Sequence, residues 1–143
     1  MTGPEPVPAP REKVNVAVLQ FEAQNTSAGD AAVVADWVRN ELVRSGKCMV
    51  LERVQMEKVM TEHALQSTGC TTEECAVKVG RLLNVNRIVI GSFGKLLSNY
   101  VISVRVVDVE MGRLVYGDTV KTESEKSMEG DIKTLAARLA GNI

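Results

Sequence analysis

The distribution of proline is the feature that most restricts how this chain can fold. All four prolines of the 143-residue sequence lie within its first ten residues, at every second position: Pro4, Pro6, Pro8 and Pro10. Proline fixes its own φ angle and lacks a backbone N–H, so such a stretch forms neither a helix nor a central strand. We therefore predict a flexible, extended arm over residues 1–12 and a single folded domain over residues 13–143.

The charge balance restricts the partners of that domain. Lysine and arginine total 17 and aspartate and glutamate 18, which gives a formal net charge of −1. Nucleic acids and anionic membrane surfaces are bound through an excess of basic residues, so we expect neither as a partner. With only 3% aromatic residues, a platform for stacking bases is also not expected. No apolar run approaches the roughly 18 residues that cross a bilayer.

Hydrophobic spacing predicts alternating strands and helices in the first part of the domain. The predicted elements are, in order, a strand at residues 14–19, a helix from an N-cap at Asp30 to a stop at Gly46, a strand at 49–51, a helix around 56–64, and a helix that follows a capping box of Thr71 and Glu74 and ends near Leu83. The polar stretch 22–29 is expected to be a loop.

The second part of the domain changes to strand periodicity. It predicts three antiparallel strands at 87–97, 100–109 and 114–122, followed by a helix that buries Ile132, Leu135, Ala136 and Leu139. Ile102, Val104 and Val106 should face helices, with the alternate residues partly wet. The order β-α-β-α-α-β-β-β-α describes an α/β fold, an α+β sandwich with a mixed sheet of about five strands flanked by helices.

Cys70 and Cys75 form the sharpest local pattern. With Thr71 as the N-cap, they occupy the two positions that pack together in a hydrophobic staple, so their thiols are expected to lie close. Three states fit this spacing: a disulfide, two reduced thiols packed as apolar groups, or half of a metal site. A metal is disfavoured because no second cysteine pair accompanies the first. Cys48 is expected to be a small buried residue.

No motif in the sequence predicts catalysis, a cofactor or a bound metal. His63 lies at the edge of an apolar helix face and is interpreted as a core or boundary imidazole. The stretch Gly91–Lys95 superficially resembles a phosphate loop, but it lacks the required glycine spacing and the serine or threonine after the lysine. Its glycines are better interpreted as a bulge or a close helix contact in a strand.

Four segments together resemble the soluble domain of the curli secretion channel family, CsgG, whose fold is shared by LpoB and the amino-terminal domain of TolB. The segments are VAVLQFEAQ at 16–24, ELVRSGKCMVLER at 41–53, TGCTTEECAVKVGRLLNVNRIVIGSFGKL at 68–96 and YVISVRVVDVEMGRLV at 100–115. Channel-forming members insert membrane-spanning hairpins with strands of about 9–11 residues. No loop predicted here is that long, so the resemblance implies the soluble scaffold without the pore.

The resemblance implies a non-enzymatic protein-interaction or assembly domain of the bacterial envelope. It further implies a periplasmic location and an outer-membrane tether outside this sequence, with the proline-rich arm as spacer. An oxidising envelope also favours the Cys70–Cys75 disulfide over the other two states. If Met1 is the native start, the alternative is a cytosolic ligand-binding or regulatory module of the same fold.

The partner is expected to be another protein or a second copy of this chain. Candidate contact residues are Arg39 and Arg44 on the first helix and Arg105 and Tyr116 on the exposed face of the strands.

Overall fold

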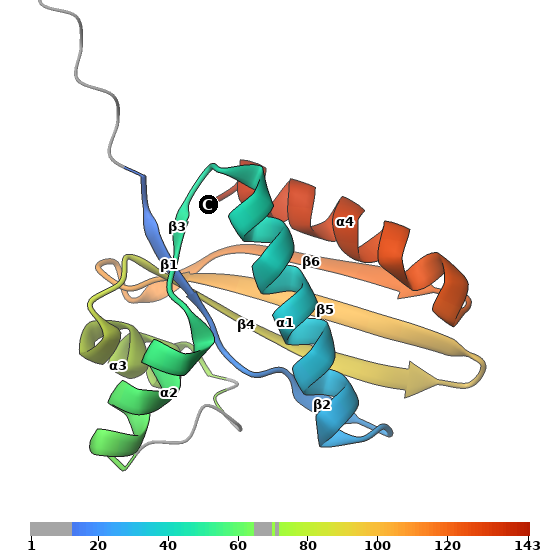
Figure 1. Cartoon of the computed structure of the whole chain (residues 1–143), viewed down its shortest axis with the longest axis horizontal. Coiled ribbons are helices and arrows are strands. Elements are labelled where there is room, and N and C mark those ends of the chain that lie inside the picture. The colour runs from blue at the N-terminus through green and yellow to red at the C-terminus, as the bar shows by residue number, and fades with distance from the viewer. Residues whose placement is uncertain (1–12, 65–69, 71) are drawn as a thin grey trace, which may run out of the picture.

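The computed structural model describes residues 13–64, 70 and 72–143, so the predicted arm at residues 1–12 lies outside the described residues. Its centre is one mixed sheet in the order β3-β1-β4-β5-β6 (Figure 1). The strands are β1 Asn15–Val18, β3 Met49–Val50, β4 Arg87–Leu96, β5 Asn99–Asp108 and β6 Arg113–Thr122. β1 runs parallel to β3 and β4, whereas β4, β5 and β6 are antiparallel. This arrangement confirms the predicted fold class.

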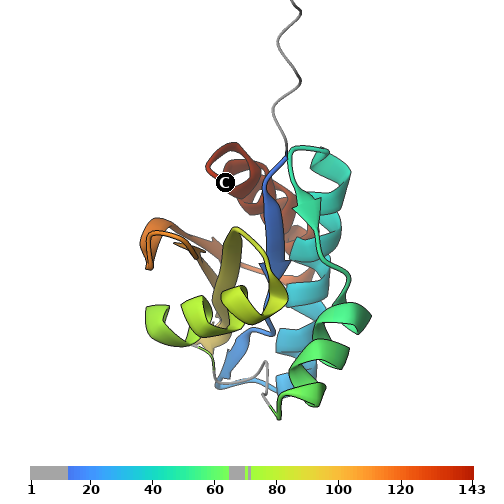
Figure 2. The ribbon, with the colours of Figure 1, turned by 90° about the vertical axis from the view of Figure 1, so that its left-hand side faces the viewer.

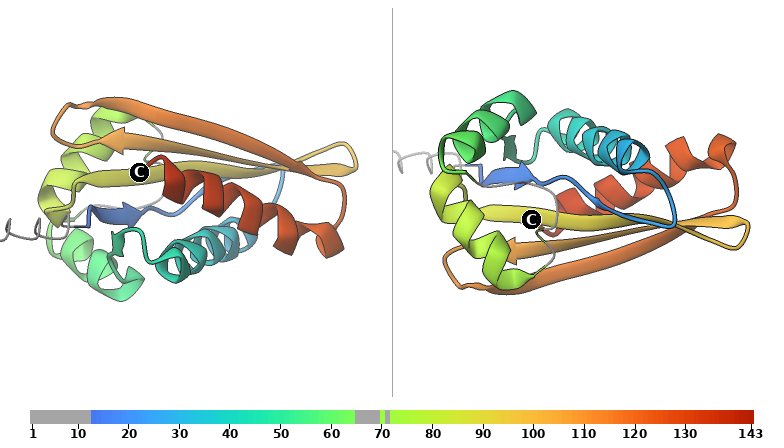
Figure 3. Two further views of the ribbon diagram at one scale, coloured as in Figure 1. Left: turned by 90° about the horizontal axis from the view of Figure 1, so that it is seen from above. Right: turned by 90° about the horizontal axis from the view of Figure 1, so that it is seen from below.

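Helices cover the two faces of the sheet unequally (Figures 2 and 3). On one face lie α1, Ala28–Ser45, and α4, Glu125–Gly141. On the other face, α2, Arg53–Glu62, and α3, Glu73–Leu83, cover only the end where β1 begins. The sheet therefore has two separate apolar cores. Ile102, Val104 and Val106 belong to the core under α1 and α4, as their alternation predicts.

Two of the predicted helix starts are wrong by one or more residues. Ser27, and not Asp30, caps α1, because its hydroxyl accepts a hydrogen bond from the Asp30 N–H at 3.0 Å. In α3 the cap is Thr72, whose hydroxyl accepts from the Cys75 N–H at 3.1 Å. Thr71 itself lies outside the described residues, and the predicted capping box is not the one that the helix uses. Gly46 ends α1 in the left-handed conformation, with φ 66°, as predicted.

A sixth strand occupies a segment predicted to be a loop. β2, Glu22–Gln24, pairs in parallel with β4 alongside the continuation of β1. Gly94 permits this pairing, because a Cβ there would lie 3.0 Å from the Gln24 Cβ. Similarly, a Cβ on Gly91 would lie 3.0 Å from the Phe21 ring. Gly94 therefore marks a close contact with β2, and Gly91 marks close contacts with Phe21 and with the Ser103 backbone of β5. The predicted bulge or helix contact is wrong.

The helices in the described part of the chain include none with both the length and the apolar character needed to cross a membrane.

Candidate functional site

A hollow lies where α1 and α4 separate from each other. The two helices pack together near their carboxyl ends and diverge toward their amino ends, above β4 and β5 (Figure 1). The hollow between them has a volume of about 180 Å³ and is named here the aromatic groove. Its apolar lining consists of Val33, Val34 and Trp37 of α1, Phe93 of β4, Tyr100 of β5 and Met128 of α4. Asp30 and Glu125, one from the first turn of each helix, add acidic groups.

The sheet supplies a rigid aromatic floor to this groove. The rings of Phe93 and Tyr100 are stacked, with centroids 5.5 Å apart and an angle of 6° between their planes. The Lys95 ammonium lies 5.9 Å from the centre of the Tyr100 ring, within cation–π range. With Trp37 on the helix wall, the groove holds three of the five aromatic side chains of the chain, which has two Phe, two Tyr and one Trp.

Exposed apolar side chains lie on the α1 wall of the groove and, outside its lining, at the tip of the β4–β5 hairpin. Val33 is 60% exposed on the α1 wall, and Leu96 and Leu97 are 59% and 89% exposed at the tip of the β4–β5 hairpin. Leu97 also has a φ of 57°, a conformation that usually favours glycine. By strand alternation Leu96 falls on the sheet face of Ile88 and Ile90, opposite to the groove, so Val33 is the exposed aliphatic residue of the groove lining. A surface that combines exposed aliphatic groups with a half-buried tryptophan is typical of a protein contact.

Arg39 differs most from its predicted role. It is only 6% exposed, and its side chain extends from the buried face of α1 to the end of β1. Its guanidinium donates to the carbonyl oxygen of Val18 at 2.6 Å and pairs with the carboxylate of Asp36. Burial lowers the pKa of Arg39, and the Asp36 hydrogen bond partly opposes that shift. The prediction of an exposed contact at Arg39 is therefore wrong: this side chain joins α1 to β1.

The other three predicted contact residues do not share one surface. Arg44 lies in the last turn of α1 with 73% of its side chain exposed. Arg105 is half-buried on β5 and pairs with Gly117. Tyr116 pairs with Val106 and packs on the core under α1 and α4, so it lies on the opposite sheet face from Arg105.

The Tyr116 hydroxyl takes part in a polar cluster beside α4. It donates to the Asp118 carboxylate at 2.9 Å, and the Arg138 Nε donates to the same carboxylate at 2.7 Å. Burial raises the pKa of Tyr116, and the Asp118 carboxylate raises it further. Burial also acts to raise the pKa of Asp118, but hydrogen bonds from Tyr116, the Thr119 N–H and Arg138 outweigh it and lower that pKa. These partners give Tyr116 a structural role in joining β6 to α4.

The cysteines are found in the first of their three predicted states. Cys70 and Cys75 form a disulfide with a Cα–Cα distance of 5.5 Å, and Cys48 is buried and free. Cys70 packs in the core under α2 and α3. Within the described residues, no group of three histidine, cysteine, aspartate or glutamate side chains is arranged to hold a metal ion.

Reduction of the disulfide is expected to lower the free energy of unfolding by about 2 kcal/mol, the loop-entropy value for a loop of roughly six residues. Urea unfolding with and without reductant measures this difference. Thiol titration in denaturant should find one thiol before reduction and three after it, because Cys48 is free. The Cys75→Ser variant serves as the control, since its stability should not respond to reductant. An unfolding midpoint of the unmodified protein that ignores reductant would contradict the prediction.

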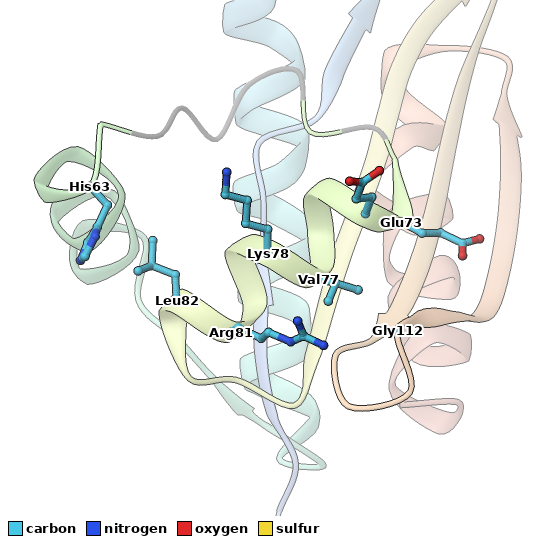
Figure 4. Close-up of a pocket in the computed structure, with 8 residues that line it drawn as sticks. His63, Glu73, Val77, Lys78, Arg81, Leu82 and Gly112 are labelled. Carbon is cyan, nitrogen blue, oxygen red and sulfur yellow. The ribbon is translucent and has the colours of Figure 1, made fainter.

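A second depression lies along α3, beside the carboxyl end of α2 and the β5–β6 turn (Figure 4). Its lining is mainly charged and of both signs: His63, Glu73, Glu74, Val77, Lys78, Arg81, Leu82 and Gly112. His63 is exposed at the carboxyl end of α2, so the core or boundary position predicted for it is wrong. Figure 4 shows His63 across from Leu82, whereas Glu73 lies at the far end of α3. His63 and Glu73 are thus not arranged as a paired acid and base.

The aromatic groove is not predictable from the sequence. Trp37 borders the apolar face of its helix, a position typical of a core residue, and Phe93 and Tyr100 carry no signal of their own. The three side chains come from α1, β4 and β5, and no spacing rule connects such distant positions. The available signal is weak: a chain this poor in aromatic residues places both Phe93 and Tyr100 beside one tight hairpin.

Comparisons with solved structures find the same fold in proteins of low sequence identity. The LpoB C-terminal domain from Escherichia coli is 14% identical, with 78% of this chain and 84% of that chain covered and a TM-score of 0.64. Lipoprotein GNA1162 from Neisseria meningitidis is 9% identical, with 90% and 97% covered and a TM-score of 0.68. The PelC dodecamer from Paraburkholderia phytofirmans is 15% identical, with 92% and 90% covered and a TM-score of 0.58.

Sequence comparison gives the family. No curated protein sequence matches this chain. The family model described as "Curli production assembly/transport component CsgG" matches residues 5–100, which is well over half of the chain. Taken with the shared fold, this match places the chain in the CsgG family.

Proposed function

We propose that this chain is a non-enzymatic protein-interaction domain of the bacterial cell envelope, and that it binds an extended segment of a protein in the aromatic groove. The CsgG family match supports an assembly or transport role, and the lipoprotein from Neisseria meningitidis supports an envelope location. The Cys70–Cys75 disulfide supports an oxidising compartment such as the periplasm over the cytosol. A tether to the outer membrane, with the proline-rich arm as its spacer, belongs to the same proposal.

The observation that carries the proposal is the composition of the groove. Trp37 and Tyr100 are half-buried, the Phe93 and Tyr100 rings are stacked, and Val33 is 60% exposed beside them. Tryptophan and tyrosine are the residues most enriched at the energetic centre of protein contacts. The volume of about 180 Å³ is below the roughly 300–1,000 Å³ of a typical small-molecule site. An extended segment that inserts a few side chains fits this space better than a cofactor does.

Two of the residues predicted from the sequence remain candidates for partner contacts outside the groove. Arg44 carries a largely exposed guanidinium, and Arg105 is half-buried on β5, paired with Ile90 on the sheet face that α2 and α3 partly cover. Neither residue lines the groove. Their role is proposed separately from it, as contacts that tune the orientation and the rate of association of the partner. Tyr116, the remaining candidate, is proposed only as a support that joins β6 to α4.

Site-specific photo-crosslinking tests the groove. A photoreactive amino acid replaces Val33 in the full chain, which is exported to the bacterial periplasm and irradiated in living cells. Val54 is the matched control, because it is an equally simple aliphatic residue, 70% exposed on α2 and outside the groove. We expect a discrete protein adduct from position 33 and none from position 54.

The Val33→Glu substitution then tests the energy of the contact. A charge in the centre of an apolar contact should weaken binding by about tenfold or more, since central side chains contribute about 2 kcal/mol. The Val54→Glu control should leave binding unchanged. Equal adducts from positions 33 and 54, or equal binding of the two glutamate variants, would reject the groove as the binding site.

A further inference from the structure

The chemistry of the aromatic groove favours one class of segment. A polyproline II helix has no internal hydrogen bonds and presents rigid pyrrolidine rings, and proteins recognise it with grooves lined by aromatic side chains. Trp37 and Tyr100 provide two such side chains in the groove lining, one from a helix and one from the sheet. This chain carries its own polyproline-like sequence between Pro4 and Pro10. Building on the proposed function of the groove, we propose that its occupant is the proline-rich arm of a second copy of this chain.

Charge supports this occupant and sets its direction. Asp30 and Glu125 are exposed in the first turns of α1 and α4, where the helices diverge. The last proline of the arm is followed directly by Arg11. An arginine at that position reaches the acidic pair when the prolines lie on the aromatic floor, which gives a charge-assisted contact. Glu5 is six residues from Arg11, about 19 Å along a polyproline II helix, and so stays away from the acidic pair.

Chain length assigns the contact of Arg11 with the acidic pair to two different copies. Arg11 is two residues from Lys13, so its Cα lies within about 7 Å of the Lys13 Cα. Lys13 lies near the carboxyl end of α1. Its charge is close enough to the Cys48 thiol to oppose the rise in the pKa of that thiol caused by burial. The carbonyl oxygen of the next residue, Val14, accepts a hydrogen bond from the Met49 N–H at 2.9 Å. Asp30 is at the other end of α1, about 22 Å from Ser45 by helix rise. The Arg11 of a chain therefore cannot reach the Asp30 of the same chain.

The result is a head-to-tail contact between copies. The start of β1 and the tip of the β4–β5 hairpin lie at opposite ends of the molecule (Figure 1). One copy offers its arm while its groove stays open for the next copy, so the contact is heterologous and can propagate.

Trp37 makes this contact directly measurable. It is the single tryptophan of the chain, and it lines the groove. Sedimentation velocity of the full chain should show association that increases with concentration, together with a blue shift of Trp37 emission. Replacing all four prolines by alanine, or Arg11→Asp alone, should weaken association by about tenfold or more, through loss of the preformed helix or through like-charge contact. Lys58→Asp is the control for charge reversal and should have no effect, because Lys58 is exposed on α2 and outside the groove.

Mixing two variants distinguishes the arm of another copy from any other occupant of the groove. Arg11→Asp and Asp30→Arg should each be monomeric alone, because each places like charges together. Their mixture should associate into assemblies of alternating copies. The aspartate introduced into one arm matches the arginine introduced into the other groove, and the unchanged arm of the second variant matches the unchanged groove of the first. Circular dichroism confirms that both variants are folded.

A mixture that stays monomeric overturns the proposal, and so does wild-type association that survives loss of the four prolines. If photo-crosslinking at Val33 still captures another protein in that case, the groove function stands with a different occupant. If it captures none, both proposals fail.

Discussion

Replacing Arg39 by methionine is expected to lower the free energy of unfolding by about 3 kcal/mol. The substitution removes the donor to the buried Val18 carbonyl and one of the two guanidinium partners of Asp36. Asp36 keeps its bond to Arg53 at 2.7 Å, so the carboxylate is not left alone. Methionine also removes the buried Nε of Arg39, which has no hydrogen-bond partner among the described residues. Both facts place the loss at the lower end of the roughly 3–5 kcal/mol typical of a broken buried pair.

Urea denaturation followed by circular dichroism measures this loss, and the melting temperature should fall by roughly 10 °C. Arg44→Met is the matched control on the same helix, because the Arg44 side chain is 73% exposed and its nearest carboxylate oxygen, on Glu41, is 3.8 Å away. Its effect should stay within about 0.5 kcal/mol. Similar losses for the two variants would show that the bond to Val18 does not hold α1 against β1.

The Gly91→Ala substitution, which adds a single methyl group, is expected to lower the free energy of unfolding by about 3 kcal/mol. This is the upper end of the usual range for overpacking. A Cβ at this position would lie 2.5 Å from the carbonyl oxygen of Ser103 and 3.0 Å from the Phe21 ring. Ser103 belongs to β5, which is hydrogen-bonded to β4 on one side and to β6 on the other. Its backbone therefore cannot move aside without breaking the ladder.

Gly130→Ala provides a control with the opposite sign. Gly130 is exposed in α4, and a Cβ there would have no neighbour within 4 Å. Alanine should stabilise the helix by up to about 1 kcal/mol, because glycine loses more backbone entropy on folding. Thermal melting of the two variants compares them directly. If Gly91→Ala melts at or above the temperature of the unmodified protein, the close approach of β5 and Phe21 at this position is refuted.

The element order is predictable because the hydrophobic pattern within most segments is enough to identify them as helix or strand. Alternation in β5 and the apolar stripe of α1 each identify an element and its buried face. β2 gives no such signal, because it has only three residues and two of them are exposed. It forms a strand by pairing with β4, which approaches it closely at Gly94. The caps are missed for a related reason: several Ser, Thr and Asp residues precede each helix, and the tertiary path of the chain selects among them.

Arg39 carries a sequence signal for burial. It is four residues after Ala35 and three before Leu42, so it falls on the apolar stripe of its own helix. A charged residue at such a position indicates a buried, partnered group and not an exposed contact. The aromatic groove offers no comparable signal, because its walls come from segments that meet only after the sheet is formed.

The antiparallel and parallel halves of the sheet are expected to form at different stages of folding. β4, β5 and β6 are neighbours in sequence, so their antiparallel ladders close short loops. The parallel half is different, because the bond from the Asn15 N–H to the Asn86 side chain spans 71 residues. Closing that loop costs more entropy, and non-local parallel pairing is slow. The antiparallel strands β4, β5 and β6 can therefore form first and serve as a template for β1. The first strand of the domain is then among the last to pair.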